Sequence, residues 1–577
     1  MSGHFFNDPP TPGMIAKLSK PGPLTIYVGL GGTIDRTGTS WAAMIATILE
    51  KNGVEKEAAQ ALIQSTSNER SATTAEILLR DATDDRNEFE RNLRDSIRAT
   101  LYSPRKHLRG RLLWNVAALA YANARAGYST MLITPNYDDY LYRELDRYYD
   151  EKKSLFPEDF ASVLQPLEVV TGTDSVGSPM ADPAGATPRG GGEGYQLPPV
   201  SVKKSSSPTI TCVHVHGFVG EDESRGTPVV GELTYNQTRR RTTDVLRQAF
   251  AGRHLIIVGS SLTDGPLCEA LLDVAAAEVE RGTPRRRRHV ISPLQAPEWR
   301  DKTLRSLLDR RHEALGLETI HPHHYGQVGQ FLSEVAGAMY RGDGSAQRTG
   351  SHPSRYNRRL RLWWEAQQPR LFENEEMPEV AYQVLKKALE RIRVVAKFVP
   401  EEELKLELWG RYDPNHLRRL RLIGTSIGPW DDAQAAHYAD IDPNSQYFAA
   451  RVFTMAAPLV HHEPPDHVGR WKSYVGIPIW VDRSTFQLPV GVAVLASMRP
   501  YSAADSRCVD GISPESVIAT PNLKRLFRAF EVMTYLGQAI LKDEGDLATA
   551  KRDILDYLRS NSRPPRRGSR APNVSSS

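Results

Sequence analysis

The strongest constraint on the fold of this chain is the alternation of short apolar segments with helix-like segments between residues 24 and 341. The apolar segments are rich in Val and Ile, which is typical of strands buried on both faces. Alternation of this kind predicts parallel strands joined by crossover helices, and therefore a Rossmann-like, doubly wound α/β sheet. The predicted strands are 24–28, 130–134, 167–170, 210–215, 254–258, 289–292 and 317–321.

Two stretches interrupt this alternation. Residues 41–109 show helical periodicity without a strand-like segment, so we interpret them as the first crossover helix with a helical insertion. Residues 171–208 consist largely of Gly, Pro, Ser and Asp. Such a segment cannot bury enough apolar surface to offset its chain entropy, and a disordered loop is expected. Residues 1–23 form an N-terminal extension in this reading.

A second domain is expected because 577 residues exceed the size of one typical domain. Residues 342–358 read as a linker, and residues 359–545 as a helical lead followed by an α+β domain. A C-terminal helix and a basic, Ser/Pro-rich disordered tail occupy 546–577. Within the second domain, strands are predicted at 405–409, 420–425, 474–481 and 490–497, and helices at 446–460 and from Leu523 onward.

Charge, cysteine content and hydropathy exclude several classes of protein. A formal net charge of +4 is too small for a dedicated nucleic-acid binder, so no specific nucleic-acid partner is expected. Cys212, Cys268 and Cys508 lack CxxC spacing, which argues against a disulfide framework and fits a reducing compartment. No signal peptide and no apolar run near the roughly 20 residues of a membrane span are present. We expect a soluble cytoplasmic protein.

Two histidine-rich clusters are candidate metal ligands. One contains His321, His323 and His324, and the other extends from His461 to His467. Neither has the regular helical spacing of a zinc site, and we interpret both as surface loops. The sequence therefore predicts no metal and no zinc.

A glycine-rich segment follows the first predicted strand and precedes helical sequence. It contains Gly29, Gly31, Gly32 and Thr33. Glycines at this position let backbone N–H groups approach a pyrophosphate, whose charge a helix N-terminus favours. A tight strand-to-helix turn explains the same residues equally well.

A small-residue segment follows the strand at 254–258. Gly259, Ser260 and Ser261 offer backbone groups and hydroxyls to a ligand at the carboxyl end of the sheet. Asp264 is expected to be the N-cap of the next helix.

Polar side chains also follow two other predicted strands. Asn136 and Asp138 come after the strand at 130–134, where an amide beside a carboxylate could orient a ribose, a water and a carboxamide. Asn and Asp also favour ordinary turns. His214 and His216 alternate onto one face near 210–215, and a histidine titrates near neutral pH and can act as a general base.

Taken in order, these four motifs resemble the signature of the SIR2 (sirtuin-like) family. The resemblance implies that Asn136 positions a ribose or the attacking water, and that Asp138 receives the nicotinamide carboxamide of NAD. Its His-Gly pair selects His216 over His214, which is the fallback. The implied catalytic residues are Asn136 and His216, and the implied NAD-binding residues are Gly29, Gly31, Gly32, Thr33, Asp138, Gly259, Ser260 and Ser261.

The resemblance further implies an NAD hydrolase rather than a deacylase. The four-cysteine zinc site and the Pro-Asp-Phe-Arg segment of protein-deacylating sirtuins are absent from the sequence. Water is then the expected acceptor, and the products are nicotinamide and linear or cyclic ADP-ribose. An NAD-dependent deacylase and a non-enzymatic receptor for NAD or ADP-ribose stay as alternatives.

The second domain resembles a GAF domain over residues 386–541. This resemblance implies a sensor for an unknown small-molecule or protein trigger, or a surface for homo-oligomer assembly. The combination resembles bacterial antiphage effectors that deplete NAD.

Overall fold

The protein is described by a computed structural model that divides into two compact units, Met1–Ser354 and Arg355–Ser577. Residues 5–559 are described except 8–9, 38, 66–67, 84, 103–109, 156–167, 172–203, 205–207, 223, 226–227, 282–286, 294–300, 341–354, 397, 399–400, 413–418, 429–436, 464–466, 484–485, 499–522 and 542–546. The expected disordered loop and C-terminal tail, and most of the expected linker, lie outside the described residues.

The first unit is built on a seven-stranded sheet with the order β3-β4-β2-β1-β7-β8-β9. Every pairing in this sheet is parallel, and β1 lies at its centre between β2 and β7. The parallel α/β sheet predicted from the alternation is therefore confirmed, and it is consistent with a Rossmann-like fold. Its strands are β1 (Leu24–Val28), β2 (Thr130–Thr134), β3 (Glu168–Thr171), β4 (Ile210–His214), β7 (His254–Val258), β8 (Arg288–Ile291) and β9 (Glu318–Ile320).

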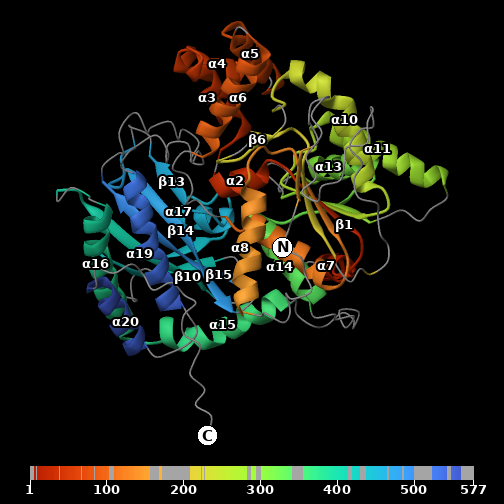
Figure 1. Cartoon of the computed structure of the whole chain (residues 1–577). Coiled ribbons are helices and arrows are strands. Elements are labelled where there is room, and N and C mark those ends of the chain that lie inside the picture. Colours follow the sequence, from red (N-terminus) through yellow and green to blue (C-terminus); the bar gives the residue numbers. More distant parts are fainter. Residues whose placement is uncertain are drawn as a thin grey trace. The chain divides into compact units, whose positions relative to one another are not determined.

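Helices cover both faces of this sheet, and Figure 1 shows α7, α8 and α14 on the opposite side from α10 and α11. Apolar residues of α10 and α11 form one buried cluster with alternate residues of the central strands, among them Tyr27, Ile133 and Ile257. On the N-terminal side, Phe5 packs against Phe331 of α14, with ring centroids 5.9 Å apart. The helices are α1 (Pro10–Leu18), α7 (Leu112–Arg125), α8 (Tyr140–Leu155), α10 (Glu232–Phe250), α11 (Gly265–Glu280), α13 (Lys302–Ala314) and α14 (Gly326–Tyr340), with a 3-10 turn, η1 (Phe5–Asn7).

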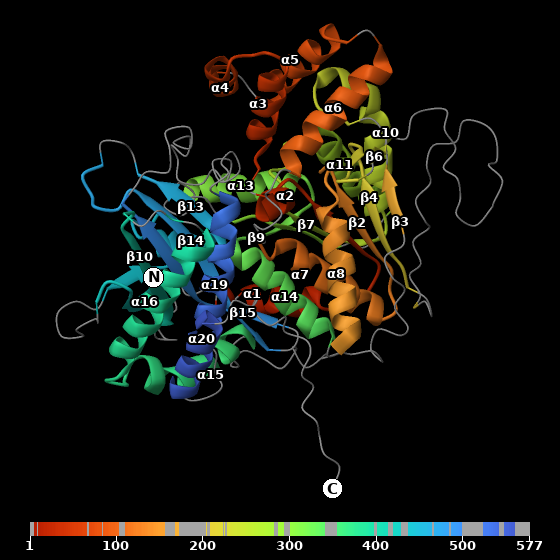
Figure 2. The ribbon, with the colours of Figure 1, turned by 60° about the vertical axis from the view of Figure 1, so that its left-hand side comes forward.

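The helical insertion predicted between the first two strands is present. Figure 2 shows α3, α4, α5 and α6 grouped beyond α2, on the side to which the strands direct their carboxyl ends. A short two-stranded hairpin, β5 (Phe218–Val219) with β6 (Ser224–Arg225), lies between β4 and α10 and was not predicted. The insertion comprises α3 (Trp41–Lys51), α4 (Lys56–Ser65), α5 (Asn68–Asp81) and α6 (Arg86–Leu101), and follows α2 (Gly31–Thr37).

The second unit is an antiparallel six-stranded sheet with the order β12-β11-β10-β15-β14-β13. The two longest strands, which were both predicted, form a hairpin in which Ser473 pairs with Ser497. Helices α16 and α17 pack closely against this sheet at two glycines. A Cβ at Gly424 would lie 2.5 Å from Ala381 of α16, and a Cβ at Gly476 would lie 2.5 Å from Val452 of α17. The strands are β10 (Leu404–Tyr412), β11 (Arg419–Thr425), β12 (Tyr438–Asp440), β13 (Leu459–His462), β14 (Ser473–Arg483) and β15 (Phe486–Ser497), and the helices are α15 (Arg355–Leu371), α16 (Met377–Ala396), α17 (Phe448–Met455), α19 (Leu523–Leu541) and α20 (Leu547–Arg559).

The predicted helix at 446–460 is wrong in its last third. Helix α17 ends at Met455 because Ala456 adopts the left-handed conformation (φ +55°), which closes the helix through bonds from its amide to Val452 and Phe453. The apolar residues that follow belong to the edge strand β13, and Val460 pairs with Val475. Across the described parts of both units, no helix is long and apolar enough to cross a membrane.

Candidate active site

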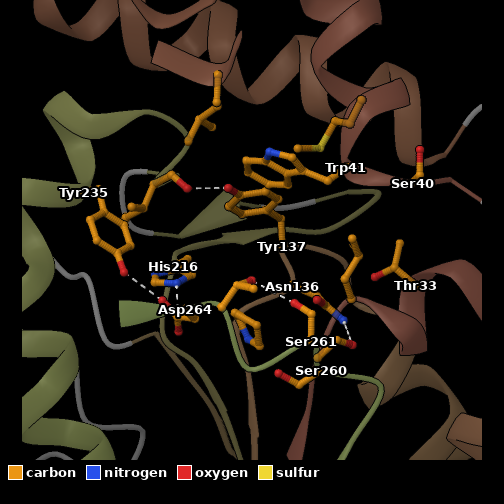
Figure 3. A pocket seen from close by; sticks show the side chains of 18 of the residues that line it. Thr33, Ser40, Trp41, Asn136, Tyr137, His216, Tyr235, Ser260, Ser261 and Asp264 are labelled. Carbon is orange, nitrogen blue, oxygen red and sulfur yellow. Dashed lines mark hydrogen bonds and ion pairs between the residues drawn. The ribbon is translucent and has the colours of Figure 1, made fainter. Parts of the chain in front are cut away.

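A cavity of about 690 Å³ lies at the carboxyl edge of the parallel sheet. Loops after β1, β2, β4 and β7 form its floor, and α3, α5 and the start of α10 contribute to its roof. Figure 3 shows that side chains from these separate segments converge on the cavity. The predicted residues that line it are Gly29, Thr33, Asn136, Asp138, His216, Gly259, Ser260 and Ser261. Gly31 and Gly32 are not among its lining residues.

Glycine is required where the loops after β1 and β7 meet. A Cβ at Gly29 would lie 2.5 Å from the carbonyl oxygen of Gly259, and a Cβ at Gly31 would lie 2.6 Å from the Cα of Gly259. Gly259 has φ +63°, which favours glycine. The amides of Gly29 and Gly31 donate to the carbonyls of Val258 and Gly259 at 2.9 and 2.8 Å. Close packing thus accounts for these glycines, as the tight-turn reading proposed.

Thr33 and Asp138 form one hydrogen-bonded pair in the cavity wall. The Thr33 hydroxyl donates to Asp138 Oδ2, and the Tyr140 amide donates to Asp138 Oδ1 at 3.2 Å. Burial raises the pKa of Asp138 to about 6, although both hydrogen bonds act to lower it. The carboxylate is therefore held in a charged state at neutral pH at a cost in stability.

Asn136 is fixed by three contacts. Its Nδ2 donates to the Gly29 carbonyl at 2.9 Å, and its backbone amide donates to Thr134 Oγ1 at 3.1 Å. Its own carbonyl lies 2.8 Å from Nδ1 of His214. The amide side chain is thus held over the glycine loop, within the same cavity as Asp138.

The two candidate histidines occupy different environments. His216 lines the cavity, whereas His214 does not and has no exposed surface. Burial lowers the pKa of His214 to about 4, and the imidazole lies beneath Asn136 in contact with its carbonyl. Burial also lowers the pKa of His216, and the nearby carboxylate of Asp264 opposes this effect.

Asp264 confirms the predicted N-cap position, at the start of α11, but does not make the side-chain contact of a cap. Its carboxylate instead accepts from the Tyr235 hydroxyl at 2.8 Å and lies 3.4 Å from the Tyr27 hydroxyl. Pro266, two residues on, has no N–H to donate to a cap, which leaves only the following amide for one.

Ser260 and Ser261 belong to a loop with a left-handed residue, Leu262 (φ +55°). The Ser260 hydroxyl accepts from the Leu262 amide at 3.1 Å, and the Ser261 hydroxyl pairs with Thr263 Oγ1 at 2.8 Å. Arg311 donates to the Leu262 carbonyl at 2.6 Å and helps to hold this conformation. The two hydroxyls therefore stabilise their own loop as well as lining the cavity.

The roof of the cavity is attached to the body at several points. Trp41 stacks on Tyr137 with centroids 6.1 Å apart, and the Tyr137 hydroxyl donates to the Val229 carbonyl. At the start of α10, the Thr234 amide donates to Glu76 Oε1 of α5 at 3.0 Å. Gly231, the N-cap of α10, offers no side chain, so a carboxylate from the insertion supplies the cap. No local pattern in the sequence indicates the contact between Glu76 and Thr234, because the two residues lie far apart in the chain.

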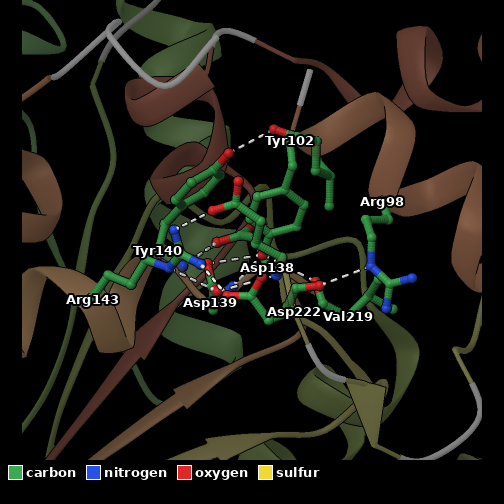
Figure 4. Close-up of polar contacts among 11 residues, drawn as sticks. Arg98, Tyr102, Asp138, Asp139, Tyr140, Arg143, Val219 and Asp222 are labelled. Carbon is green, nitrogen blue, oxygen red and sulfur yellow. Dashed lines mark hydrogen bonds and ion pairs between the residues drawn. The ribbon is translucent and has the colours of Figure 1, made fainter. Parts of the chain in front are cut away.

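Asp139, next to the cavity residues, links the insertion to the floor. Figure 4 shows Tyr102 and Arg143 gathered around it. The Asp139 amide donates to the Tyr102 hydroxyl at 2.8 Å, and Arg143 Nε donates to its carboxylate at 2.8 Å. The Tyr102 hydroxyl also lies 3.0 Å from the Val219 carbonyl. Asp139 thus has a structural role that the sequence did not indicate.

The histidine clusters make internal contacts. His321 lies 2.6 Å from Asp309 and 3.1 Å from the Ser292 carbonyl, and His461 lies 3.2 Å from Glu463. In the part of the chain that the structure describes, no group of three or more His, Cys, Asp or Glu residues could hold a metal ion. The expectation of no zinc stays a prediction.

The geometry above, with polar residues on the carboxyl ends of adjacent parallel strands, invites comparison with known families. Residues 130–320 match the SIR2-like domain family. The match extends from β2 to β9 and includes Asn136, Asp138, His216 and Asp264. Strand β1 and its glycine loop precede the match, but β1 pairs with β2 and β7 in the same parallel sheet as the matched residues. Comparison with curated proteins found no match.

Proposed function

We propose that the first unit hydrolyses NAD at the bond between nicotinamide and ribose. One observation carries the proposal: Asn136, Asp138 and His216 follow adjacent strands of a SIR2-like domain and line one cavity. Parallel sheets bind their ligands at this edge. The cavity is within the usual size range for a ligand the size of a cofactor. Gly29, Thr33, Gly259, Ser260 and Ser261 are proposed to contact the phosphates and riboses, and Gly31 and Gly32 are proposed to shape the NAD-binding loop that carries Gly29.

In the proposed reaction, the electron pair of the broken bond leaves with nicotinamide and neutralises its positive charge. The oxygen of a water molecule bonds to the ribose carbon, and one proton is released. Asn136 would orient the water or the ribose, and Asp138 would accept from the carboxamide of nicotinamide. His216 would contact a ribose hydroxyl or relay the proton. The products are nicotinamide and ADP-ribose, or a cyclised form of it.

The second unit is proposed to be a GAF-like sensor that restrains the first. Its support is the order of elements, in which α16, the hairpin β14–β15 and the closing helix α19 accompany an antiparallel sheet. Unrestrained hydrolysis would deplete NAD in the cell that makes the protein. A trigger that binds this unit, or homo-oligomer assembly, would release the restraint. The biological role proposed on this basis is bacterial antiphage defence by NAD depletion in the cytoplasm.

The test is NAD consumption by the purified chain, with identification of the products by mass spectrometry. Asn136→Ala and His216→Ala should each lower turnover by about 10²-fold or more, because each removes a positioned polar group. Asn374→Ala, in the second unit, is the matched control and should keep the wild-type rate. Wild-type turnover in folded Asn136→Ala and His216→Ala would refute the site. Tight NAD binding without products would favour a receptor, and cleavage only with an acylated peptide would favour a deacylase.

A further inference from the structure

Asp264 is the centre of a polar cluster around His216, and the proposed reaction gives Asp264 itself no role. Tyr235 of α10 donates to its Oδ1 at 2.8 Å, and Tyr27 of β1 lies 3.4 Å from its Oδ2. Nε2 of His216 lies 3.9 Å from the same Oδ2. Figure 3 shows Tyr235, Asp264 and His216 side by side in the cavity. Contacts from α10 and β1 therefore hold the Asp264 carboxylate, at the start of α11, near the imidazole of His216.

The surroundings of this cluster strengthen its electrostatic effect. The side chains of His216 and Asp264 are only 11% and 20% exposed. Charges interact more strongly at such sites than in water because the local dielectric constant is lower. The other ionisable neighbours are Arg239 beside Tyr235, and Cys268 with Arg311.

The two ring nitrogens of His216 face different partners. Nε2 faces the carboxylate, whereas Nδ1 is buried and meets no partner at full hydrogen-bond geometry in the described part of the chain, although the Val215 backbone also favours a proton on the ring. Neutral imidazole carries one N–H, and an ionised carboxylate can only accept. A proton on Nε2 is therefore attracted by Asp264, while a proton on Nδ1 would be a buried donor without a well-aligned acceptor. The geometry selects the Nε2–H tautomer.

We propose that Asp264 is a positioning residue that keeps the proton of His216 on Nε2, so that His216 acts as a hydrogen-bond donor and not as a base. Tyr235 and Tyr27 hold Asp264 in place. The inference rests on the proposed function and chooses between the two roles left open for His216. A ribose hydroxyl between the two groups would accept from Nε2–H and donate to Asp264. The substrate group recognised here is thus one that both donates and accepts.

The first test reads the tautomer directly and needs no turnover. The full-length protein would be prepared with ¹⁵N-labelled histidine, and the His216 signals assigned by their loss in His216→Gln. Neutral His216 should show a protonated Nε2 and an unprotonated Nδ1, and Asp264→Asn should lower its pKa. A protonated Nδ1 in the wild type, or an unchanged pKa in Asp264→Asn, would overturn the proposal. This result stands even if the wild type proves not to cleave NAD, which would refute the function alone.

The second test measures NAD turnover in matched variants. Asp264→Asn keeps the shape but removes the charge, and should lower kcat by about 10- to 100-fold, as loss of a charge-assisted hydrogen bond does. Tyr235→Phe should lower kcat by less, and Asp273→Asn, on the solvent side of α11, should not change it. His216→Gln places an N–H near the position of Nε2 and should be about 10-fold faster than His216→Ala. Equal rates for His216→Gln and His216→Ala, or wild-type kcat in Asp264→Asn, would overturn the assignment.

Discussion

The two units of this protein use their buried polar groups in opposite ways. In the second unit such groups pair with one another: the Ser497 hydroxyl donates to Glu402, and Arg411 donates to the Tyr356 hydroxyl. In the first unit, polar groups instead converge on a cavity, and Asp138 is buried there as an acid whose pKa is raised. Polar groups that lower stability persist where they serve a ligand. The comparison therefore agrees with the proposal that the first unit carries the chemistry.

The largest expected effect separates two histidines within the first unit. His216→Ala should lower NAD turnover by about 10²-fold without changing the thermal midpoint, since its ring lines the cavity. His214→Ala should lower the stability of the unit by about 2–4 kcal/mol, since it leaves a cavity and removes the contact to the Asn136 carbonyl. Turnover and thermal unfolding of both variants check this. A stable but inactive His214→Ala, with an active His216→Ala, would reverse the assignment.

Removing the second unit tests whether it restrains the first. A chain ending at Ser354 should cleave NAD faster than the resting full-length protein, by up to about 10²-fold, which corresponds to roughly 3 kcal/mol of preference between two states. Rates would be compared at several protein concentrations, with and without extract from infected cells. Identical rates for both chains under all conditions would remove the sensor role.

The pKa of Asp138 gives a prediction about stability. Its value in the folded state, about 6, lies above the ordinary 3.8, so the folded unit binds this proton more tightly than the unfolded chain. Stability from this group is present below pH 3.8 and is lost as pH rises through about 6. Asp138→Asn should therefore raise stability at pH 7.5 by about 1–3 kcal/mol, and the gain should vanish near pH 4. A loss of stability at pH 7.5, measured by denaturant unfolding, would contradict this reading.

A smaller effect is expected at the contact between α5 and α10. Glu76→Ala leaves the Thr234 amide without its acceptor and should cost about 1–2 kcal/mol, as loss of a helix cap does. Glu76→Gln keeps an acceptor oxygen and should be close to the wild type. NAD turnover should fall a few-fold in Glu76→Ala only, because Tyr235 lies in the first turn of α10. Equal behaviour of the two variants would show that α5 does not hold this helix end.

The smallest effect is expected for residues 171–208. Replacing this Gly- and Pro-rich stretch with a short Gly/Ser turn should change stability and turnover little, since closure entropy grows slowly with loop length. Thermal unfolding and NAD consumption of the shortened chain check this. A large loss of either property would show that the stretch contributes to the cavity.

The sequence predicted the parallel sheet well because its strands are apolar on both faces, and β1, β2 and β7 have the predicted bounds. Motifs at strand ends also predicted that Asn136 and His216 lie close together, since parallel strands end at the same edge of a sheet, and both residues line one cavity. What local patterns could not show were contacts made only in the folded chain. Asp264 looked like a cap for its own helix, and its partner Tyr235 had no local signal.

Other misses followed from the same cause in the second unit. The strand β13 has apolar residues that also continue the helical pattern of α17, and the turn at Ala456 separates them. Because a non-glycine residue in the left-handed conformation has no clear sequence signature, the boundary could not be placed. The edge strand β12 is short and lacked the length to be recognised.

The contact between the loops of Gly29 and Gly259 also bears on how the chain is synthesised. The pairing of β1 with β7 joins residues 24–28 to residues 254–258, so a ribosome-bound chain carries Trp41, Asn136 and His216 long before the sheet can close. Domains fold only once their elements have emerged, and long-range pairings form late. Until β7 emerges, the part of the cavity floor formed by Gly259, Ser260, Ser261 and Asp264 is absent. Strand order itself therefore delays completion of the site, and under the proposed function a chain that ends before β7 would leave the NAD pool intact.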